Sequence, residues 1–212
     1  MLTNCSQEYR DLFVQKINPG AETLERLDAY DAVLRQWQAR VNLISDSTLP
    51  ALWSRHFLDS AQIYRHLPAS AQTLTDIGSG GGFPGMVLAI LTSMSGGPIV
   101  TLIESNGRKA EFLREANRIC AAGAKIMNVR AECAPILPAD VVTARACAPL
   151  IRLLPWVHRC LGAGGVALLS KGLNWRDELT TAEKHWNMGL AEIPSITDTS
   201  GVILKLEGLN PN

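Results

Sequence analysis

The sequence predicts an α/β fold in which a parallel sheet is covered by helices on both faces and is preceded by a helical extension. The apolar residues of segment 21–67 recur at steps of three and four, which is the period of an α-helix. After residue 73 the pattern changes, and short apolar runs alternate with amphipathic segments, as strands and helices do around a parallel sheet. We therefore expect residues 1–70 to form a helical extension that packs on a core at residues 71–212, with both parts in a single structural unit.

The composition is that of a globular protein. The chain has 212 residues, of which 47% are hydrophobic, and its formal net charge is zero. A neutral chain has no global attraction to nucleic acid, so RNA binding would need a local patch or a partner already on the RNA. The five cysteines form no C-x-x-C pair and no metal-ligand cluster with the four histidines. No apolar run approaches the roughly 18 residues that span a bilayer. We expect a cytoplasmic monomer with no metal and no membrane partner.

Three helices are expected in the extension. The longest covers residues 21–44 and is amphipathic, with one buried stripe. A second helix is expected over residues 49–67, and a shorter one at residues 7–16 precedes both. The stripe of the longest helix is formed by Leu24, Leu27, Val33, Leu34, Trp37 and Val41.

Strands and helices alternate in the core. The strands are expected at 73–77, 99–103, 125–129, 140–143, 166–170 and 201–206. The helices between them are expected at 84–91, 106–122, 149–161 and 174–186. In a sheet of this kind ligands lie beyond the carboxyl ends of the strands, at the point where the strand order reverses. The polar residues that follow each strand are therefore the candidates for function.

The strongest functional signal is the segment 76–85, DIGSGGGFPG, between the first strand and the first helix of the core. Glycines such as Gly78 and Gly80 lack a Cβ and accept positive φ, so a ligand can lie against bare backbone. Pro84 suits a first helical turn, and a helix start presents unpaired N–H groups. This turn predicts a binding site for a small polar molecule.

Two ligand classes compete for this turn. Residues 80–85 also satisfy the dinucleotide pattern G-x-G-x-x-G, with Glu104 about 20 positions later. Asp76, however, places a carboxylate directly before the glycines, where it would repel a pyrophosphate. S-adenosylmethionine carries an ammonium and a sulfonium that a carboxylate attracts directly or through water. The spacing favours this methyl donor, and an NAD-dependent oxidoreductase remains the alternative.

Further candidates follow the next strands. Glu104 is expected to accept hydrogen bonds from the ribose hydroxyls, or else to be an anion at a helix start. Ala131 and Glu132 lie at the height of an adenine, whose edge backbone amides can read. Arg145 could hold a phosphate or carboxylate, or form a salt bridge with Asp76 or Glu132.

Three further positions are ambiguous from spacing alone. Asp59 shares a helix face with His56, three residues earlier, and with Arg55, four residues earlier, which fits an intrahelical ion pair beside a histidine as well as a functional site. Lys171 could contact a phosphate or lie in a solvated turn. Cys147 raises the possibility of a thiolate nucleophile, but a buried structural cysteine is favoured because the proline typical of such enzymes does not precede it.

Together these residues resemble the bacterial small-subunit rRNA methyltransferase G family, also called glucose-inhibited division protein B. The resemblance covers about residues 37–172. Its motifs here are Asn42-Leu43, Arg55-His56-x-x-Asp59-Ser60, Asp76-x-Gly78-x-Gly80-x-Gly82-Phe83-Pro84-Gly85, Leu102-x-Glu104-Ser105, Lys109-x-x-Phe112-Leu113, Arg130-x-Glu132, Ala144-Arg145-Ala146 and Lys171-Gly172. The sequence departs from the family at Ile44, where threonine is usual, and at Ala148-Pro149, which replaces Ala-Ser.

The resemblance implies a Rossmann-like class I S-adenosylmethionine-dependent methyltransferase fold and methyl transfer to N7 of one guanine in the decoding region of 16S rRNA, within a 30S particle or an assembly intermediate. It implies cofactor contacts at Gly78, Phe83, Ala131, Glu132 and Arg145. Guanine N7 has a free lone pair, so the enzyme mainly has to align the reactants, and no general base is required.

The RNA contacts would include Arg55, His56 and Lys171, and the catalytic candidates are Arg145 and His56. A nonenzymatic rRNA-binding assembly factor remains a further alternative. A phosphate-binding rim could be formed by Arg40, Arg55, Arg108, Lys109, Arg145 and Lys171.

Overall fold

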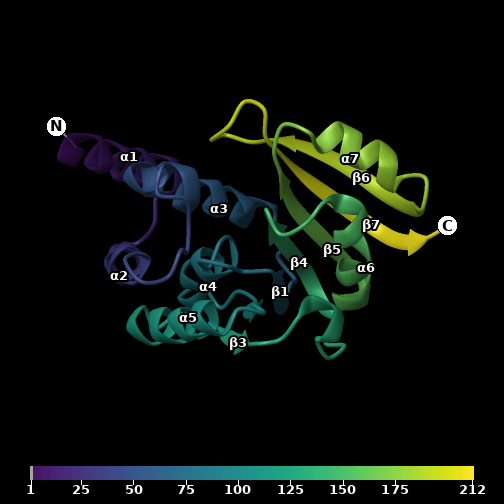
Figure 1. Ribbon diagram of the computed structural model, residues 1–212, viewed down its shortest axis with the longest axis horizontal. Coiled ribbons are helices and arrows are strands. Elements are labelled where there is room, and N and C mark those ends of the chain that lie inside the picture. The colour runs from purple at the N-terminus through teal and green to yellow at the C-terminus, as the bar shows by residue number, and fades with distance from the viewer. Residues whose placement is uncertain (1) are drawn as a thin grey trace.

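A seven-stranded sheet lies between two layers of helices in the computed structural model, which describes residues 2–212 and their side chains from residue 6 onward (Figure 1). The strand order is β3-β2-β1-β4-β5-β7-β6. The order reverses between β1 and β4, where ligands bind in sheets of this type. The strands are β1 Thr73–Ile77, β2 Ile99–Ile103, β3 Lys125–Met127, β4 Ala139–Arg145, β5 Leu161–Lys171, β6 Trp186–Pro194 and β7 Val202–Pro211.

The first five strands are parallel, and β7 runs antiparallel to both of its neighbours. The helices α4 (Gly85–Ser93) and α5 (Gly107–Ile119) cover one face, whereas α6 (Leu150–Cys160) and α7 (Trp175–Ala182) cover the other (Figure 1). Each face has its own cluster of buried apolar side chains. The predicted α/β fold, with helices on both faces of the sheet, is therefore confirmed, but the sheet is mixed and not wholly parallel as predicted.

The extension packs over α4 and α5, and its side chains belong to the same apolar cluster as theirs. Phe13, Leu27 and Phe57 of the extension are fully buried in the cluster that also holds Leu88 of α4 and Leu113 of α5. Burying such side chains fully is worth about 1.5–3 kcal/mol each, so the extension shares much of the core. Its helical elements are α1 (Leu2–Ile17), α2 (Ala21–Gln38), η1 (Leu49–Ala51), η2 (Trp53–Leu58), α3 (Asp59–Ala61) and η3 (Gln62–His66).

The long helix of the extension ends earlier than predicted, at Gln38 instead of residue 44. The Gln38 side chain explains this end, because its Oε1 accepts hydrogen bonds from the backbone N–H groups of Leu43 and Ile44, at 3.0 and 3.2 Å. Its Nε2 also donates to the Ile44 carbonyl at 2.8 Å. The side chain thereby supplies partners for a turn that leaves the helix.

The bounds predicted for β1 and β2 are confirmed, whereas the end of the chain differs from the prediction. The helix predicted at 174–186 ends at Ala182, and β6 (Trp186–Pro194) was not predicted at all. This strand lies at the sheet edge, and most of its residues are exposed. An irregular register between Asn187 and Gly189 also interrupts its alternation, so no period-two pattern marks it in the sequence.

Candidate functional site

The glycine loop, residues 76–85, turns from β1 into α4 at the carboxyl end of the sheet. Gly78 and Gly80 have φ angles of 71° and 57° and are half-exposed, whereas Ser79 between them is buried. The N–H groups of Gly78 and Ser79 both donate to the carbonyl of Ile103, at 2.9 and 3.0 Å. A Cβ at Gly78 would lie 2.3 Å from Sγ of Cys147. Only glycine fits at Gly78, and bare backbone is presented there.

Asp76 lies beneath the glycine loop and is fully buried. Its Oδ2 accepts a hydrogen bond from the N–H of Gly85 at 3.2 Å, and its Oδ1 accepts one from the hydroxyl of Thr143 at 2.9 Å. Burial raises the pKa of Asp76 to about 6. The carboxylate therefore ties the start of α4 to β4, and its attraction for a cation would act across the loop.

Glu104, at the end of β2, is 7% exposed and connects the glycine loop to α5. Its Oε2 accepts a hydrogen bond from Gly80 N–H at 2.8 Å, and its Oε1 accepts one from Asn106 N–H at 2.7 Å. Ala131 and Glu132 follow β3 in the short helix η4 (Ala131–Cys133), where Ala131 is half-buried and Glu132 exposed. Because β1, β2 and β3 are neighbours, the predicted cofactor residues on these strands share one edge of the sheet.

Phe83 is 4% exposed, and its ring packs against aromatic side chains of the extension. The ring centroid lies 4.9 Å from that of His56, 5.7 Å from that of Tyr30 and 5.8 Å from that of Phe57. The Tyr30 hydroxyl also donates a hydrogen bond to the carbonyl of Gly81. This aromatic cluster fastens the glycine loop to the extension, so a contact of Phe83 with a ligand would involve its backbone.

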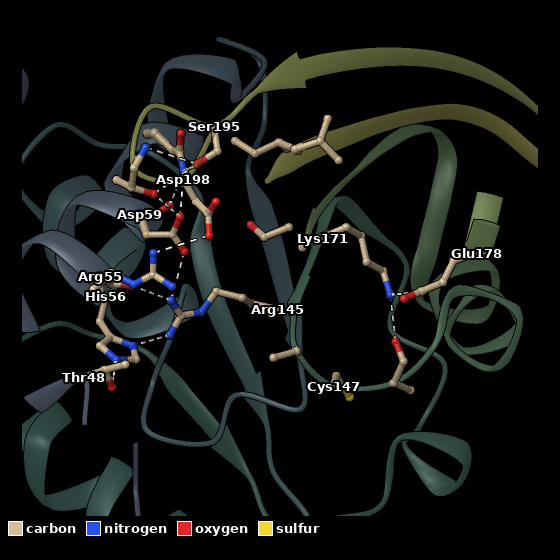
Figure 2. A pocket seen from close by; sticks show the side chains of 18 of the residues that line it. Thr48, Arg55, His56, Asp59, Arg145, Cys147, Lys171, Glu178, Ser195 and Asp198 are labelled. Atoms are coloured by element: carbon tan, nitrogen blue, oxygen red, sulfur yellow. Dashed lines mark hydrogen bonds and ion pairs between the residues drawn. The ribbon is translucent and has the colours of Figure 1, made fainter. Parts of the chain in front are cut away.

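Arg145, at the end of β4, is bound by the extension. Its Nη1 donates to the Asp59 carboxylate at 2.9 Å and to the Arg55 carbonyl at 3.1 Å, and its Nη2 lies 2.7 Å from His56 Nδ1 (Figure 2). The guanidinium also lies 5.1 Å above the ring of Phe83. The carboxylate partner of Arg145 is thus Asp59, and not Asp76 or Glu132 as the sequence suggested.

His56 uses both ring nitrogens within the protein. Its Nε2 lies 2.8 Å from the Thr48 hydroxyl, and its Nδ1 faces the guanidinium of Arg145, which can only donate. Burial, and then the positive charges of Arg145 and Arg55, lower the pKa of His56 to about 3. The imidazole is therefore neutral and has no free lone pair, which fits a positioning role and not that of a general base.

A π-helical turn, η2, presents these residues. The N–H of Asp59 donates to the carbonyl of His56, and the Arg55 carbonyl accepts a hydrogen bond from Arg145. Turns of this kind occur frequently at functional sites in helices. Arg145 is thus bound in part to the backbone of this turn.

A cavity of about 650 Å³, which we call the polar cavity, opens beside Arg145 (Figure 2). Its volume lies within the range of small-molecule sites, ~300–1,000 Å³. Its polar side chains come from the residue before η1, from η2, α3 and η3, from the ends of β4 and β5, from α7 and from the loop between β6 and β7. They are Thr48, Arg55, His56, Asp59, Gln62, Arg145, Cys147, Ser170, Lys171, Glu178, Ser195, Thr197 and Asp198.

Two ion pairs form opposite walls of the polar cavity (Figure 2). Asp59 pairs with Arg145, and both side chains are 17% exposed. Lys171, predicted to contact RNA, is 8% exposed, and its Nζ donates at 2.8 Å to both Glu178 and the Ala148 carbonyl. Its ammonium therefore belongs to the cavity wall in this structure.

Cys147 connects the glycine loop to the polar cavity, because it contacts Gly78 and also lines the cavity. Burial raises the pKa of its thiol, so the side chain is protonated near neutral pH and is a poor nucleophile. The neighbouring Ala146 has a φ of 50°, which is uncommon for a residue other than glycine. Residues 145–147 thus form a constrained wall between the two features.

The sequence reasoning missed the loop between β6 and β7. Thr197 donates to Asp59 at 2.6 Å, Ile196 N–H donates to the Gln62 side chain at 2.9 Å, and Asp198 pairs with Arg55 at 3.4 Å. Short polar loops of this composition are common, and no motif marks residues 195–198. Only the pairing of β6 and β7 brings the loop to the extension.

The profile of the rRNA small subunit methyltransferase G family matches residues 23–203. A relative named ribosomal RNA small subunit methyltransferase G from Rhodospirillum centenum is 52% identical over 190 residues, which are 90% of this chain and 86% of the relative. A relative of the same name from Gluconobacter oxydans is 49% identical over 87% of this chain and 93% of its own length.

The chain belongs to the rRNA small subunit methyltransferase G family.

Solved structures agree on the fold of this methyltransferase G family member. An O-methyltransferase from Bacillus cereus in complex with SAH matches with a TM-score of 0.58 and 12% identity, over 98% of this chain and 100% of the other. A tRNA (m1A58) methyltransferase from Aquifex aeolicus matches with a TM-score of 0.55 and 16% identity, over 71% and 68% of the two chains. The predicted Rossmann-like class I methyltransferase fold is confirmed.

As a methyltransferase G family member, the chain is an S-adenosylmethionine-dependent methyltransferase. The residues present fit this cofactor, because Gly78 and Gly80 present half-exposed backbone beside the Glu104 carboxylate. Neither alternative, the NAD-dependent oxidoreductase or the nonenzymatic assembly factor, is favoured. Among the described residues no group of three or more His, Cys, Asp or Glu side chains could hold a metal ion. No helix within residues 2–212 has the length and apolar character needed to cross a bilayer.

Proposed function

We propose that this protein transfers a methyl group from S-adenosylmethionine to N7 of a guanine in the decoding region of 16S rRNA, within a 30S particle or an assembly intermediate. Relatives at about half identity carry the name ribosomal RNA small subunit methyltransferase G, which supports this substrate. The observation that carries the proposal is the wall at residues 145–147, which the glycine loop and the polar cavity share. A donor on the loop and a base in the cavity would meet across this wall.

The donor side would consist of the edge formed by β1, β2 and β3. We propose that the backbone of Gly78, Gly80 and Phe83 faces the cofactor and that Glu104 accepts the ribose hydroxyls. Ala131 and Glu132 would hold the adenine, with the Ala131 backbone reading its edge. The Asp76 carboxylate would attract the positive charge of the cofactor from beneath the loop. Arg145 would contact the cofactor from the end of β4.

The reaction requires no proton transfer by the residues of this protein. S-adenosylmethionine supplies an electrophilic methyl group, and guanine N7 supplies a lone pair and loses no proton. Alignment of the reactants is therefore the main task. The docked Arg145 and the neutral His56, whose two nitrogens are bound, suit such a rigid site. We propose positioning roles for both residues.

On the RNA side we propose Arg55, which is 48% exposed, as a phosphate contact. His56 would position Arg145 and would affect RNA binding only through it. Lys171 would have to leave Glu178 to reach a phosphate. We further propose that residues 1–70 and 71–212 form one structural unit, because they share an apolar cluster. A monomer in the cytoplasm is the form in which we expect the protein to meet its substrate.

Transfer of tritiated methyl groups tests this function. The purified protein is incubated with assembling 30S particles, mature subunits or free 16S rRNA from a strain that lacks the gene. We expect incorporation into 16S rRNA of a particle, and mass spectrometry of the digested RNA should find 7-methylguanosine at one position. Absence of incorporation from all three substrates would contradict the proposal. Binding of S-adenosylmethionine without turnover would favour the assembly factor, and thermal stabilisation by NAD alone would favour the oxidoreductase.

A further inference from the structure

The polar cavity contains three carboxylates, and Asp198 forms the longest of their three ion pairs. Both oxygens of Asp59 are bonded, Oδ1 to Gln62 and Thr197 and Oδ2 to Arg145. Glu178 Oε2 accepts hydrogen bonds from Lys171 at 2.8 Å and from the N–H of Leu150 at 2.7 Å. Asp198 Oδ2, by contrast, has a single contact among the described residues, with Arg55 at 3.4 Å. This distance is at the limit for a hydrogen bond.

The backbone around Asp198 is nevertheless well supported. Its Oδ1 accepts hydrogen bonds from the N–H and the hydroxyl of Ser200, at 2.9 and 2.7 Å, and its carbonyl accepts one from Gly201. Thr197 is bonded to Asp59, which fixes the loop to the extension. The Ser200 bonds also lower the pKa of the Asp198 carboxyl and favour its ionised form. One oxygen thus holds the carboxylate in place while the other faces the cavity.

A hydroxyl group in the wall of the polar cavity has no partner among the described residues. The Ser170 hydroxyl oxygen is buried and makes no hydrogen bond within the described part of the chain. Buried hydroxyls are normally bonded, so an unbonded one in a cavity wall indicates a missing partner. Ser170 lies next to Arg145 in the pairing of β4 and β5, close to the wall shared with the glycine loop.

The geometry of guanine fits this arrangement. N7 lies on one side of the purine, and the N1–H and N2–H₂ donors lie on the opposite, Watson–Crick edge. If N7 faces the wall at Cys147, the two donors face away from it. Figure 2 shows Asp198 and Cys147 on opposite sides of the cavity. The cavity-facing oxygen, Oδ2, has two lone pairs and can accept from both donors, whereas adenine offers no matching pair of donors.

We propose that Asp198 is the residue that recognises the Watson–Crick edge of the target guanine in the polar cavity, and that the base displaces Arg55 from it. The released Arg55 then binds a phosphate of the same RNA. The Arg55–Asp198 contact is thus made only while RNA is absent. This inference rests on the proposed function and adds its base-recognition residue, with the flanking loop as the element that selects guanine.

Guanine and inosine distinguish this role, because inosine keeps N7, N1–H and O6 but lacks the N2 amino group. Small subunits are reconstituted with either guanine or inosine at the methylated position, which is first identified by mass spectrometry of the digested RNA. For the wild type we expect kcat/KM to be about tenfold or more lower on inosine, as for loss of a hydrogen bond to a charged acceptor. Asp198→Asn should lower the guanine value by a similar factor and should remove the preference. Asparagine still offers an oxygen to Ser200, so the loop is retained.

Two further variants separate recognition from structure. Arg55→Gln removes the ion pair but leaves the carboxylate, so it should keep the guanine preference while lowering the salt dependence of RNA binding. Glu192→Gln, an exposed residue of β6, controls for the loss of one negative charge and should change neither rate nor preference. Binding of S-adenosylmethionine, measured by calorimetry, should be unchanged in all three variants.

The outcomes are distinguishable. If Asp198→Asn keeps the wild-type preference, or if Arg55→Gln loses it, Asp198 does not recognise the base. Equal rates of the wild type on guanine and inosine would overturn this inference alone and leave the proposed function intact. No methyl transfer by the wild type to either subunit would overturn the proposed function and this inference with it.

Discussion

The glycine loop and the polar cavity lie side by side at the carboxyl end of the sheet, but they are assembled in different ways. The loop is one continuous segment of ten residues, 76–85, supported by Asp76 from within the same segment. The cavity draws its walls from η2, β4, β5, α7 and the β6–β7 loop, which are far apart in the chain. Its contacts depend on long-range packing, as the Arg145–Asp59 pair shows. The proposed site for the methyl donor is therefore formed mainly by a local motif, whereas the proposed site for the methyl acceptor is formed by tertiary packing.

The largest effect is expected in the glycine loop. Gly78→Asp places a Cβ 2.3 Å from Cys147 Sγ at a φ of 71°, so the loop cannot keep its shape. We expect the affinity for S-adenosylmethionine, measured by calorimetry, to fall by about 100-fold or more. Gly96→Asp is the matched control, since Gly96 has a φ of 67° but no atom near its Cβ position. Equal losses in both variants would show that backbone strain, and not the loop surface, causes the effect.

A second effect is expected where the polar cavity meets the extension. Asp59→Ala leaves the guanidinium of Arg145 without its carboxylate and Thr197 without its acceptor. We expect the free energy of unfolding, from urea titration, to fall by about 2–3 kcal/mol. Glu115→Gln, which breaks an exposed pair on α5, should cause no measurable loss. A loss no larger than that of the control would mean that Asp59 does not hold the two parts together.

The two regions should also respond to pH in opposite directions. The pKa of Asp76 is raised from 3.8 to about 6, so its contribution to the unfolding free energy decreases as the pH rises through this interval. The pKa of His56 is lowered from 6.5 to about 3, so its contribution decreases as the pH falls through that interval. Each group changes the unfolding free energy by about 1.4 kcal/mol per pH unit, and the two changes oppose each other between pH 4 and 6.

Substitutions can separate these slopes. In Asp76→Asn the contribution of His56 should remain, and the unfolding free energy should rise with pH between 4 and 6 relative to the wild type. In His56→Asn the contribution of Asp76 should remain, and the relative change should have the opposite sign. Urea titrations at several pH values measure both. Parallel curves for the wild type and either variant would mean that the group in question does not have its expected pKa.

The smallest effect concerns Lys171, whose ammonium is bound to Glu178 and the Ala148 carbonyl. We expect Lys171→Met to leave the salt dependence of RNA binding unchanged, although it removes a positive charge. Arg55→Gln should reduce the slope of log K against log salt by about one. Filter binding across a salt series measures both slopes. A reduced slope in Lys171→Met would show that the lysine leaves the wall and contacts RNA, as the sequence suggested.

The sequence alone was sufficient to predict the parallel part of the sheet, the glycine loop and the family resemblance. Apolar periodicity is a local property, which is why β1 and β2 were predicted with their observed bounds. Glycine spacing is equally local, because positive φ angles at Gly78 and Gly80 follow from the turn itself. The predicted acidic residue at the end of β2, Glu104, does lie beside Gly80.

Only the tertiary structure decided what the charged residues do. The spacing of Arg55, His56 and Asp59 suggested an ion pair within one helix, but Asp59 pairs with Arg145, and Arg55 contacts Asp198. The β6–β7 loop carries no motif, and β6 is an exposed edge strand without regular alternation. A charge interacts with whatever the fold brings within a few ångströms of it, and that proximity is set by how sheet and extension pack. Neighbouring residues thus determine the backbone conformation, whereas the packing of distant segments determines which side chains become partners in the cavity.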